Sequence, residues 1–205
     1  MKEIYKGIDI VIFDVMGVII TSPSLVRDGL YPHYKGKYDY EYLKDLYRKI
    51  RKETQGDASL WDGVGEKNPD VARKGFLDRF VLDTGFWDFR DFLEKENFRK
   101  GVLSNMPREW GEYFFEKLNF EKEFDPVVIS GQVGMKKPDE GIYLEFEKRS
   151  GIPLQKSLFI DDKLGNLETA SNLGVKTVHF KRVEKKGDKG LFQPDYEITS
   201  FAELL

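Results

Sequence analysis

The stretch SLFIDDKLGNLETASNLGVKTVHF, residues 157–180, decides the fold. Residues 157–162 and 176–180 are short apolar runs with the composition of strands that are buried on both faces. Residues 165–174, between them, have a helix-like composition, and Gly174 stands where a helix would end. A strand, a helix and a second strand in this order predict two parallel strands joined by a crossover helix.

The same alternation runs through most of the chain. Further strands are expected in residues 8–14, 100–105 and 126–130, helices in residues 88–98, 107–120 and 138–151, and a last strand and short helix in residues 195–205. Pro107 and Pro138 fall where the first turn of a helix tolerates proline, and Gly151 falls where a helix ends. The pattern therefore predicts an α/β fold with a mainly parallel sheet covered by helices on both faces.

One segment interrupts the alternation. Residues 21–85 contain no convincing strand, whereas residues 38–53 and 69–82 have apolar residues at helical spacing. We therefore predict a helical insertion, residues 21–85, after the first strand of a core domain formed by residues 1–20 and 86–205.

The composition restricts the class of partner. The 205 residues include 40% hydrophobic and 34% charged residues, and the formal net charge of −3 gives no sign of a nucleic-acid surface. There is no cysteine, which excludes disulfides and thiolate chemistry.

No apolar run approaches the roughly 20 residues needed to cross a bilayer, and residues 1–14 lack the cleavage site of a signal peptide. We expect a cytoplasmic protein that acts on a small molecule, without nucleic-acid or membrane partners; the oligomeric state is not readable.

Polar residues follow several of the predicted strands. Asp14, Ser104 and the pair Asp161 and Asp162 stand at strand ends, and Lys137 lies in the turn before the helix of residues 138–151. Ligands of open α/β sheets bind beyond the carboxyl ends of the strands. The sequence therefore predicts an active site at this edge of the sheet.

Each of these residues also has a purely structural interpretation. Asp14 could cap a turn, Ser104 and Asn105 could cap the helix that begins near Pro107, and Lys137 could be a solvated surface residue. In the functional interpretation Asp14 is a carboxylate nucleophile, Ser104 donates to an anionic substrate, and Lys137 neutralises both.

Asp161 and Asp162 are adjacent acids at the end of a buried strand. Two such carboxylates repel each other in a site of low dielectric constant unless a cation is present. Mg²⁺ prefers oxygen ligands and commonly binds one or two carboxylates together with a substrate phosphate. The alternative is a helix cap with one solvated neighbour.

Four motifs in this order resemble those of the haloacid dehalogenase (HAD) superfamily of hydrolases. They are FDVMGVI at residues 13–19, VLSN at 102–105, KKPDEGIY at 136–143 and FIDDKLGNLETASNLG at 159–174. The resemblance, which is to the phosphatase-like branch, implies a Rossmann-like core of three α/β/α layers with a helical cap inserted after the first strand.

The resemblance also implies a mechanism. In the phosphatases of the family the residue that matches Asp14 attacks phosphorus and forms an aspartyl phosphate, which water then hydrolyses. Mg²⁺ is held by Asp14, by the backbone carbonyl of Met16 and by Asp161, with Asp162 close by or ligating through water. The implied protein is a Mg²⁺-dependent phosphohydrolase that acts on a small phosphorylated metabolite.

Further residues would bind the phosphoryl group. The resemblance assigns this role to backbone N–H groups that follow the nucleophile, including Gly17, and to Ser104, Asn105 and Lys137.

Met16 departs from the family pattern, because the phosphatases carry an aspartate there that protonates the leaving group. General acid–base assistance contributes roughly 10²- to 10⁴-fold in rate, or about 3 to 5 kcal/mol. Three alternatives follow: a leaving group that departs unprotonated, halide displacement by a metal-independent haloacid dehalogenase, or a metabolite-binding protein without catalysis. A replacement acid could also come from the cap, where His33 titrates near neutrality.

Overall fold

The computed structural model describes residues 2–22, 24–50, 56–120, 122–182 and 192–205. Within them, parallel strands form one six-stranded sheet in the order β3-β2-β1-β4-β5-β6. The strands are β1 (Ile10–Phe13), β2 (Arg99–Ser104), β3 (Val127–Ile129), β4 (Ser157–Asp161), β5 (Lys176–Phe180) and β6 (Tyr196–Ile198). The chain reverses its direction of winding between β1 and β4, which is the position where open α/β sheets bind ligands.

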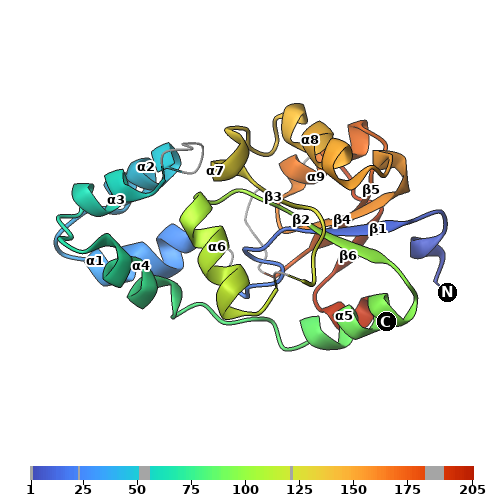
Figure 1. The fold of residues 1–205 in the computed structure, drawn as a ribbon, viewed down its shortest axis with the longest axis horizontal. Coiled ribbons are helices and arrows are strands. Elements are labelled where there is room, and N and C mark those ends of the chain that lie inside the picture. The colour runs from blue at the N-terminus through green and yellow to red at the C-terminus, as the bar shows by residue number, and fades with distance from the viewer. Residues whose placement is uncertain (1, 23, 51–55, 121, 183–191) are drawn as a thin grey trace.

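Helices cover both faces of the sheet (Figure 1). They are α5 (Phe86–Lys95), α6 (Arg108–Lys117), α7 (Ser130–Val133), α8 (Glu140–Ser150), α9 (Leu164–Asn172) and the short 3-10 helix Phe201–Leu204. Side chains of β1 alternate between two apolar clusters: Phe13 packs with residues of α5, and Ile12 packs with residues of α8 and α9. The predicted Rossmann-like α/β core is confirmed.

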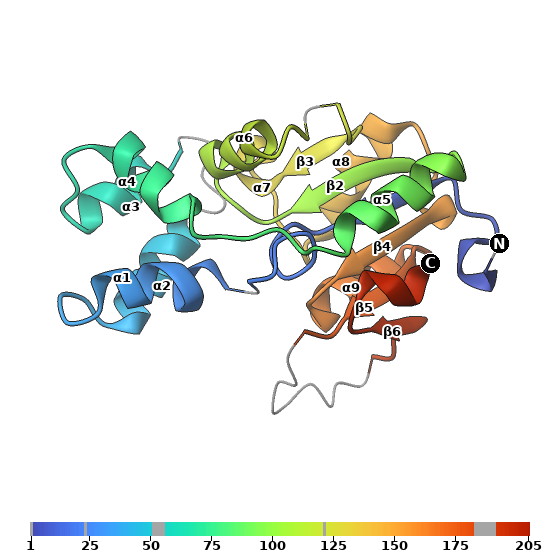
Figure 2. The ribbon, with the colours of Figure 1, turned by 90° about the horizontal axis from the view of Figure 1, so that it is seen from below.

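The helical insertion lies at one end of the molecule, beside the sheet, in both views (Figures 1 and 2). Its helices are a π-helical turn (Val26–Leu30), α1 (Tyr31–Tyr34), α2 (Tyr40–Ile50), α3 (Ala58–Gly63) and α4 (Pro69–Leu77). Helices α2 and α4 lie within the two segments that helical spacing indicates; α4 ends at Leu77, before the end of the predicted 69–82, and residues 51–53 of the first segment lie outside the described residues. No helix in the described part of the chain is long and apolar enough to span a membrane.

The chain enters and leaves the insertion through two adjacent linkers. The Thr21 N–H donates to the Val81 carbonyl (3.0 Å), and the Asp83 N–H donates to the Ile19 carbonyl (2.8 Å). Arg182, which follows β5, pairs with Asp83 (Nη1 to Oδ2, 2.6 Å) and donates to the backbone carbonyl of Gly17 (2.8 Å). These contacts fix the linkers against the loop that follows β1.

A buried carboxylate joins the insertion to the core. Asp57, immediately before α3, accepts hydrogen bonds from the indole nitrogens of Trp61 and Trp110, both at 2.6 Å. Arg73 on α4 donates to the same carboxylate at 2.6 and 2.7 Å. Since Trp110 belongs to α6 of the core, Asp57 holds elements of both parts. The Trp110 ring also stacks on Tyr47 of α2, which is a further contact between the core and the insertion.

Candidate active site

Four polar side chains from separate segments meet beyond the carboxyl ends of the strands. Asp14 follows β1, Ser104 ends β2 and Asp161 ends β4, while Lys137 comes from the loop before α8. All four are buried. The neighbouring, parallel arrangement of β2, β1 and β4 is what brings their ends together.

The Asp14 carboxylate is held through one of its oxygens. Oδ1 accepts hydrogen bonds from the Ser104 hydroxyl (2.6 Å) and the Val15 N–H (2.8 Å), and it lies 3.1 Å from Lys137 Nζ. Oδ2 receives no hydrogen bond from the described residues. Burial raises the pKa of Asp14, but the charges of Lys137 and Lys163 and the Ser104 hydroxyl together outweigh it and hold the pKa below its ordinary value. Asp14 is therefore an ionised carboxylate with one oxygen fixed and the other available.

Lys137 connects two acids of the site. Its Nζ lies 2.6 Å from Asp161 Oδ2 and donates to the Leu103 carbonyl at 2.7 Å, and its side chain is fully buried. Asn105 holds the backbone of Lys137 on both sides: its amide nitrogen donates to the Lys137 carbonyl and its amide oxygen accepts from the Lys137 N–H, each at 2.8 Å. The side-chain amide of Asn105 is thus engaged in positioning Lys137.

Three carboxylates have the arrangement of a cation site. Oxygens of Asp14, Asp161 and Asp162 lie within 4.8 Å of one another, and all three residues are buried. Burial raises the pKa of Asp161 to about 6; Lys137 opposes this shift, and the charges of Asp14 and Asp162 add to it. A concentration of buried negative charge and oxygen-only donors fits Mg²⁺, whose charge would relieve the repulsion.

Two residues that the sequence did not single out support Asp161. The Lys163 N–H donates to Asp161 Oδ1 (2.8 Å), and the Asn166 amide donates to Asp161 Oδ2 (2.9 Å). The Lys163 ammonium lies 3.3 Å from Asp162 Oδ1 on a side chain that is 48% exposed. Desolvation lowers the pKa of Lys163, but the negative charges of Asp162, Asp14 and Asp161 outweigh it. The pKa of Lys163 is therefore above its ordinary value. In the sequence, the position of Lys163 directly after Asp161 and Asp162 could have indicated its place in the site.

The expected role of Gly17 requires a correction. Its N–H donates to the Ile20 carbonyl (2.8 Å), so in this structure it does not point to a bound anion. Gly17 instead has a φ of +86°, and a Cβ there would lie 2.7 Å from Asp162 Cγ. Glycine is required because it allows this backbone conformation and leaves room for Asp162.

A cavity of about 120 Å³ opens above these groups. Asp14, Met16, Asn105, Lys137, Lys163 and Asn166 line it from the core, and Ser24, Leu25 and Tyr47 line it from the insertion. Tyr47 is 33 residues beyond Asp14 in the sequence, and no motif marked it. Met16 is buried and lines this cavity, at the position where the resemblance would place an acid.

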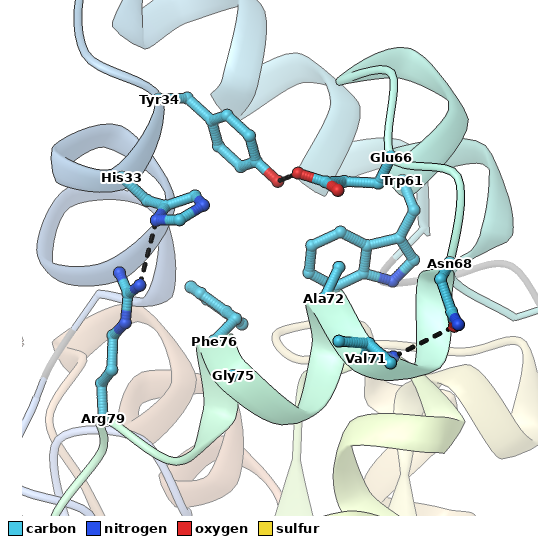
Figure 3. Close-up of a pocket in the computed structure, with 10 residues that line it drawn as sticks. All are labelled: His33, Tyr34, Trp61, Glu66, Asn68, Val71, Ala72, Gly75, Phe76 and Arg79. Carbon is cyan, nitrogen blue, oxygen red and sulfur yellow. Dashed lines mark hydrogen bonds between the residues drawn. The ribbon is translucent and has the colours of Figure 1, made fainter.

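His33 lies elsewhere. It lines a second cavity, inside the insertion, and its Nδ1 is 3.0 Å from Nη2 of Arg79 (Figure 3). It is not among the residues that line the cavity of Asp14. The structure therefore does not bring His33 to the candidate nucleophile.

Comparisons with known proteins agree with the fold. A family model described as "Haloacid dehalogenase-like hydrolase" matches residues 83–180. The chain is 23% identical over 214 residues to the phosphorylated carbohydrates phosphatase of Thermotoga maritima, which covers 95% of this chain and 99% of the relative. It is also 23% identical over 218 residues to the (S)-2-haloacid dehalogenase of Pseudomonas putida, which covers 97% of this chain and 96% of the relative.

A solved structure extends the comparison. A HAD family enzyme from Bacteroides thetaiotaomicron, in complex with magnesium and inorganic phosphate, has a TM-score of 0.71 at 21% identity, with 91% of this chain and 100% of that chain covered. At this identity the likeness establishes a shared fold.

Proposed function

Because the chain belongs to the haloacid dehalogenase superfamily of hydrolases, we propose that it is a Mg²⁺-dependent phosphohydrolase with Asp14 as its nucleophile. The observation that carries the proposal is the asymmetric setting of the Asp14 carboxylate. Three donors surround Oδ1, and none of the described residues donates to Oδ2. A carboxylate fixed in this way presents a single oxygen to an incoming phosphorus atom.

The reaction has two steps. Asp14 Oδ2 forms a bond to phosphorus while the bond from phosphorus to the leaving oxygen breaks, and that oxygen keeps the electron pair. Water then attacks the phosphorus of the aspartyl phosphate, the bond to Oδ2 breaks, and the carboxylate is regenerated. Lys137, buried beside Asp14, would stabilise the negative charge of the phosphoryl oxygens.

Mg²⁺ would be held by Asp14, Asp161 and the backbone carbonyl of Met16, with Asp162 beside it. When bound, it neutralises charge on the phosphoryl group. Its place is supported by the three clustered carboxylates of this chain and by the magnesium and phosphate bound to the Bacteroides thetaiotaomicron enzyme.

Met16 restricts the substrate. A thioether cannot give a proton to a departing alkoxide, so substrates with leaving groups that need no proton are favoured, such as acyl phosphates and activated esters. The cavity of about 120 Å³ favours a small phosphorylated metabolite.

The test is hydrolysis of acetyl phosphate and p-nitrophenyl phosphate with and without Mg²⁺. We expect metal-dependent release of phosphate that is lost in Asp14→Asn, whose side chain keeps its shape but is not a nucleophile. Absence of turnover by protein that binds Mg²⁺ would contradict the proposal and favour a metabolite-binding role.

Halide displacement is the second candidate, because a halide also leaves unprotonated and the chain resembles the Pseudomonas putida (S)-2-haloacid dehalogenase. Metal-independent release of chloride from 2-chloropropionate, lost in Asp14→Asn, would replace the first proposal with this one.

A further inference from the structure

A second cavity is lined by residues of the helical insertion, opens to solvent where His33 and Arg79 are exposed, and shares no lining residue with the cavity of Asp14. Its volume is about 230 Å³, which is below the roughly 300 to 1,000 Å³ of pockets for drug-sized ligands. Figure 3 shows the rings of Trp61, Tyr34 and Phe76 around it. The size and these walls suit a small molecule with an apolar body.

Gly75 keeps this cavity open. It lies inside α4, where glycine is the least favourable residue after proline. A Cβ at Gly75 would meet no atom within 4 Å, and its φ is not in the left-handed region. Gly29 differs, because a Cβ there would lie 2.3 Å from Phe76. Neither packing nor backbone conformation requires glycine at this exposed position, and Gly75 is one of the residues that line the cavity.

One end of the cavity is cationic. Arg79 donates to His33 Nδ1 at 3.0 Å, and no carboxylate pairs with Arg79 within the described ranges of the chain. Because Nδ1 acts as the acceptor, the proton of the neutral imidazole is on Nε2. Figure 3 shows this second ring nitrogen facing the space in front of Trp61. Arg79 and His33 together offer donors to an anionic group.

The other end is anionic. Glu66 Oε1 accepts a hydrogen bond from the Tyr34 hydroxyl at 2.8 Å, and no lysine or arginine of the described segments pairs with Glu66. Figure 3 shows Glu66 across the cavity from His33 and Arg79. The cavity therefore has unpaired charges of opposite sign at separate positions, with aromatic rings between them.

We propose that this cavity is a binding site for an ω-amino acid, a small molecule with a carboxylate and a primary ammonium at opposite ends of an apolar chain. Its carboxylate would be bound by Arg79 and His33, its ammonium by Glu66, and its chain by Trp61 and Phe76. The site is separate from the proposed catalytic centre.

The test uses three flexible probes: 6-aminohexanoate, hexanoate and hexylamine. Binding is measured by calorimetry and by the NMR resonance of the Trp61 indole N–H, assigned with Trp61→Phe. We expect saturable binding of 6-aminohexanoate, with hexanoate and hexylamine at least about tenfold weaker, since each lacks one charge-assisted hydrogen bond. Absence of saturable binding of 6-aminohexanoate at millimolar concentrations would overturn the proposal.

Substitutions separate the two ends. Arg79→Gln should weaken hexanoate and 6-aminohexanoate about tenfold or more but leave hexylamine unchanged. Glu66→Gln, which retains an acceptor for the Tyr34 hydroxyl, should weaken hexylamine and 6-aminohexanoate but leave hexanoate unchanged. Equal effects of both variants on all three probes would contradict the assigned ends.

Filling the cavity gives an independent measurement. Gly75→Leu should abolish binding of 6-aminohexanoate, and Gly75→Ala, which adds one methyl group, controls for changes in the helix and should retain it. Asp14→Asn should bind normally, so that failure of the proposed catalysis is distinguishable from failure of this site. Binding that survives Gly75→Leu in a folded protein would show that the probe binds elsewhere and would refute the proposal.

Discussion

Asp57 and Trp110 are joined by a buried hydrogen bond of 2.6 Å from the indole Nε1 to Oδ2, which links the helical insertion to α6 of the core. The same carboxylate pairs with Arg73, whose Nη2 lies 2.6 Å from Oδ1. The Asp57 carboxylate therefore accepts from buried indole donors in the insertion (Trp61) and in the core (Trp110). Its removal would leave these two donors without a partner.

Asp57→Asn should therefore lower the free energy of unfolding by about 3 to 5 kcal/mol, because it removes the buried charge that pairs with Arg73 and leaves the exposed Asp70 as its remaining partner. Asp70→Asn is the matched control: Asp70 also pairs with Arg73, but its side chain is 87% exposed, and its loss should cost less than about 1 kcal/mol. Urea denaturation measures both. Equal losses in the two variants would show that burial does not set the strength of the Asp57 contacts.

Ser104→Ala should lower kcat about 10- to 100-fold, since it removes a hydrogen bond to a charged group worth roughly 1.5 to 3 kcal/mol. The bond in question is the 2.6 Å contact with Asp14 Oδ1. Ser157→Ala is the control, because the Ser157 hydroxyl is buried at the start of β4 without a hydrogen-bond partner. Initial rates with acetyl phosphate measure kcat for both variants. An unchanged kcat in Ser104→Ala would show that the hydrogen bond to Asp14 Oδ1 does not position the nucleophile.

Met16→Asp should raise the rate with substrates that have poor leaving groups by up to about 10²- to 10⁴-fold, because it supplies the missing acid. The rate with acetyl phosphate should change little. Met16→Asn, of similar size but without a proton to transfer, is the control. A gain of the same size in Met16→Asn would show that the shape of the side chain, and not acid catalysis, is responsible.

Mg²⁺ binding should weaken as the pH falls through about 6, where a proton competes for Asp161. The pKa of Asp161 is raised from about 3.9 in an unfolded chain, so this group's contribution to the stability of the metal-free protein is present below about pH 4 and is lost as the pH rises to about 6. Mg²⁺ should consequently increase Tm more at pH 7.5 than at pH 5. Asp161→Asn should abolish the increase; a persistent, pH-independent increase would place the cation elsewhere.

Gly75→Ala should increase the free energy of unfolding by about 0.4 to 1 kcal/mol, because alanine is the better helix former and restricts the unfolded chain. The new methyl group meets nothing within 4 Å. Gly29→Ala should instead destabilise the protein, since its Cβ would lie 2.3 Å from Phe76. Thermal denaturation compares the pair, and destabilisation by Gly75→Ala would indicate a packing role for that glycine.

The sheet and the ends of its strands were predictable from the sequence. Apolar runs fix the strands, and parallel strands align their carboxyl ends, so Asp14, Ser104 and Asp161 were expected to meet. Lys137 was expected there as well, because it lies in a turn that opens a helix after a strand. These predictions needed only local patterns and the rule for connecting them.

The positions of individual side chains in the insertion were harder to predict from the sequence. The position of Tyr47 over the site depends on how α2 packs against Trp110 of the core, a tertiary contact that helical spacing does not encode. His33 was the candidate for a replacement acid from the cap, but it packs beside Tyr34 and contacts Arg79 in another cavity. Gly17 was expected to bind the phosphoryl group through its N–H, whereas its close approach to Asp162 is a tertiary contact that the sequence does not reveal.

The paired linkers at Ile19 to Thr21 and Val81 to Asp83 have a consequence for how this architecture can vary. Since the chain leaves the core and returns to it at hydrogen-bonded neighbours, the end-to-end span of the inserted segment is fixed independently of its length. A different module could be grafted between these residues without changing the register of any strand. These hydrogen-bonded neighbours thus separate the core, which carries the candidate nucleophile, from the inserted segment, and they mark where chimaeric proteins should be joined.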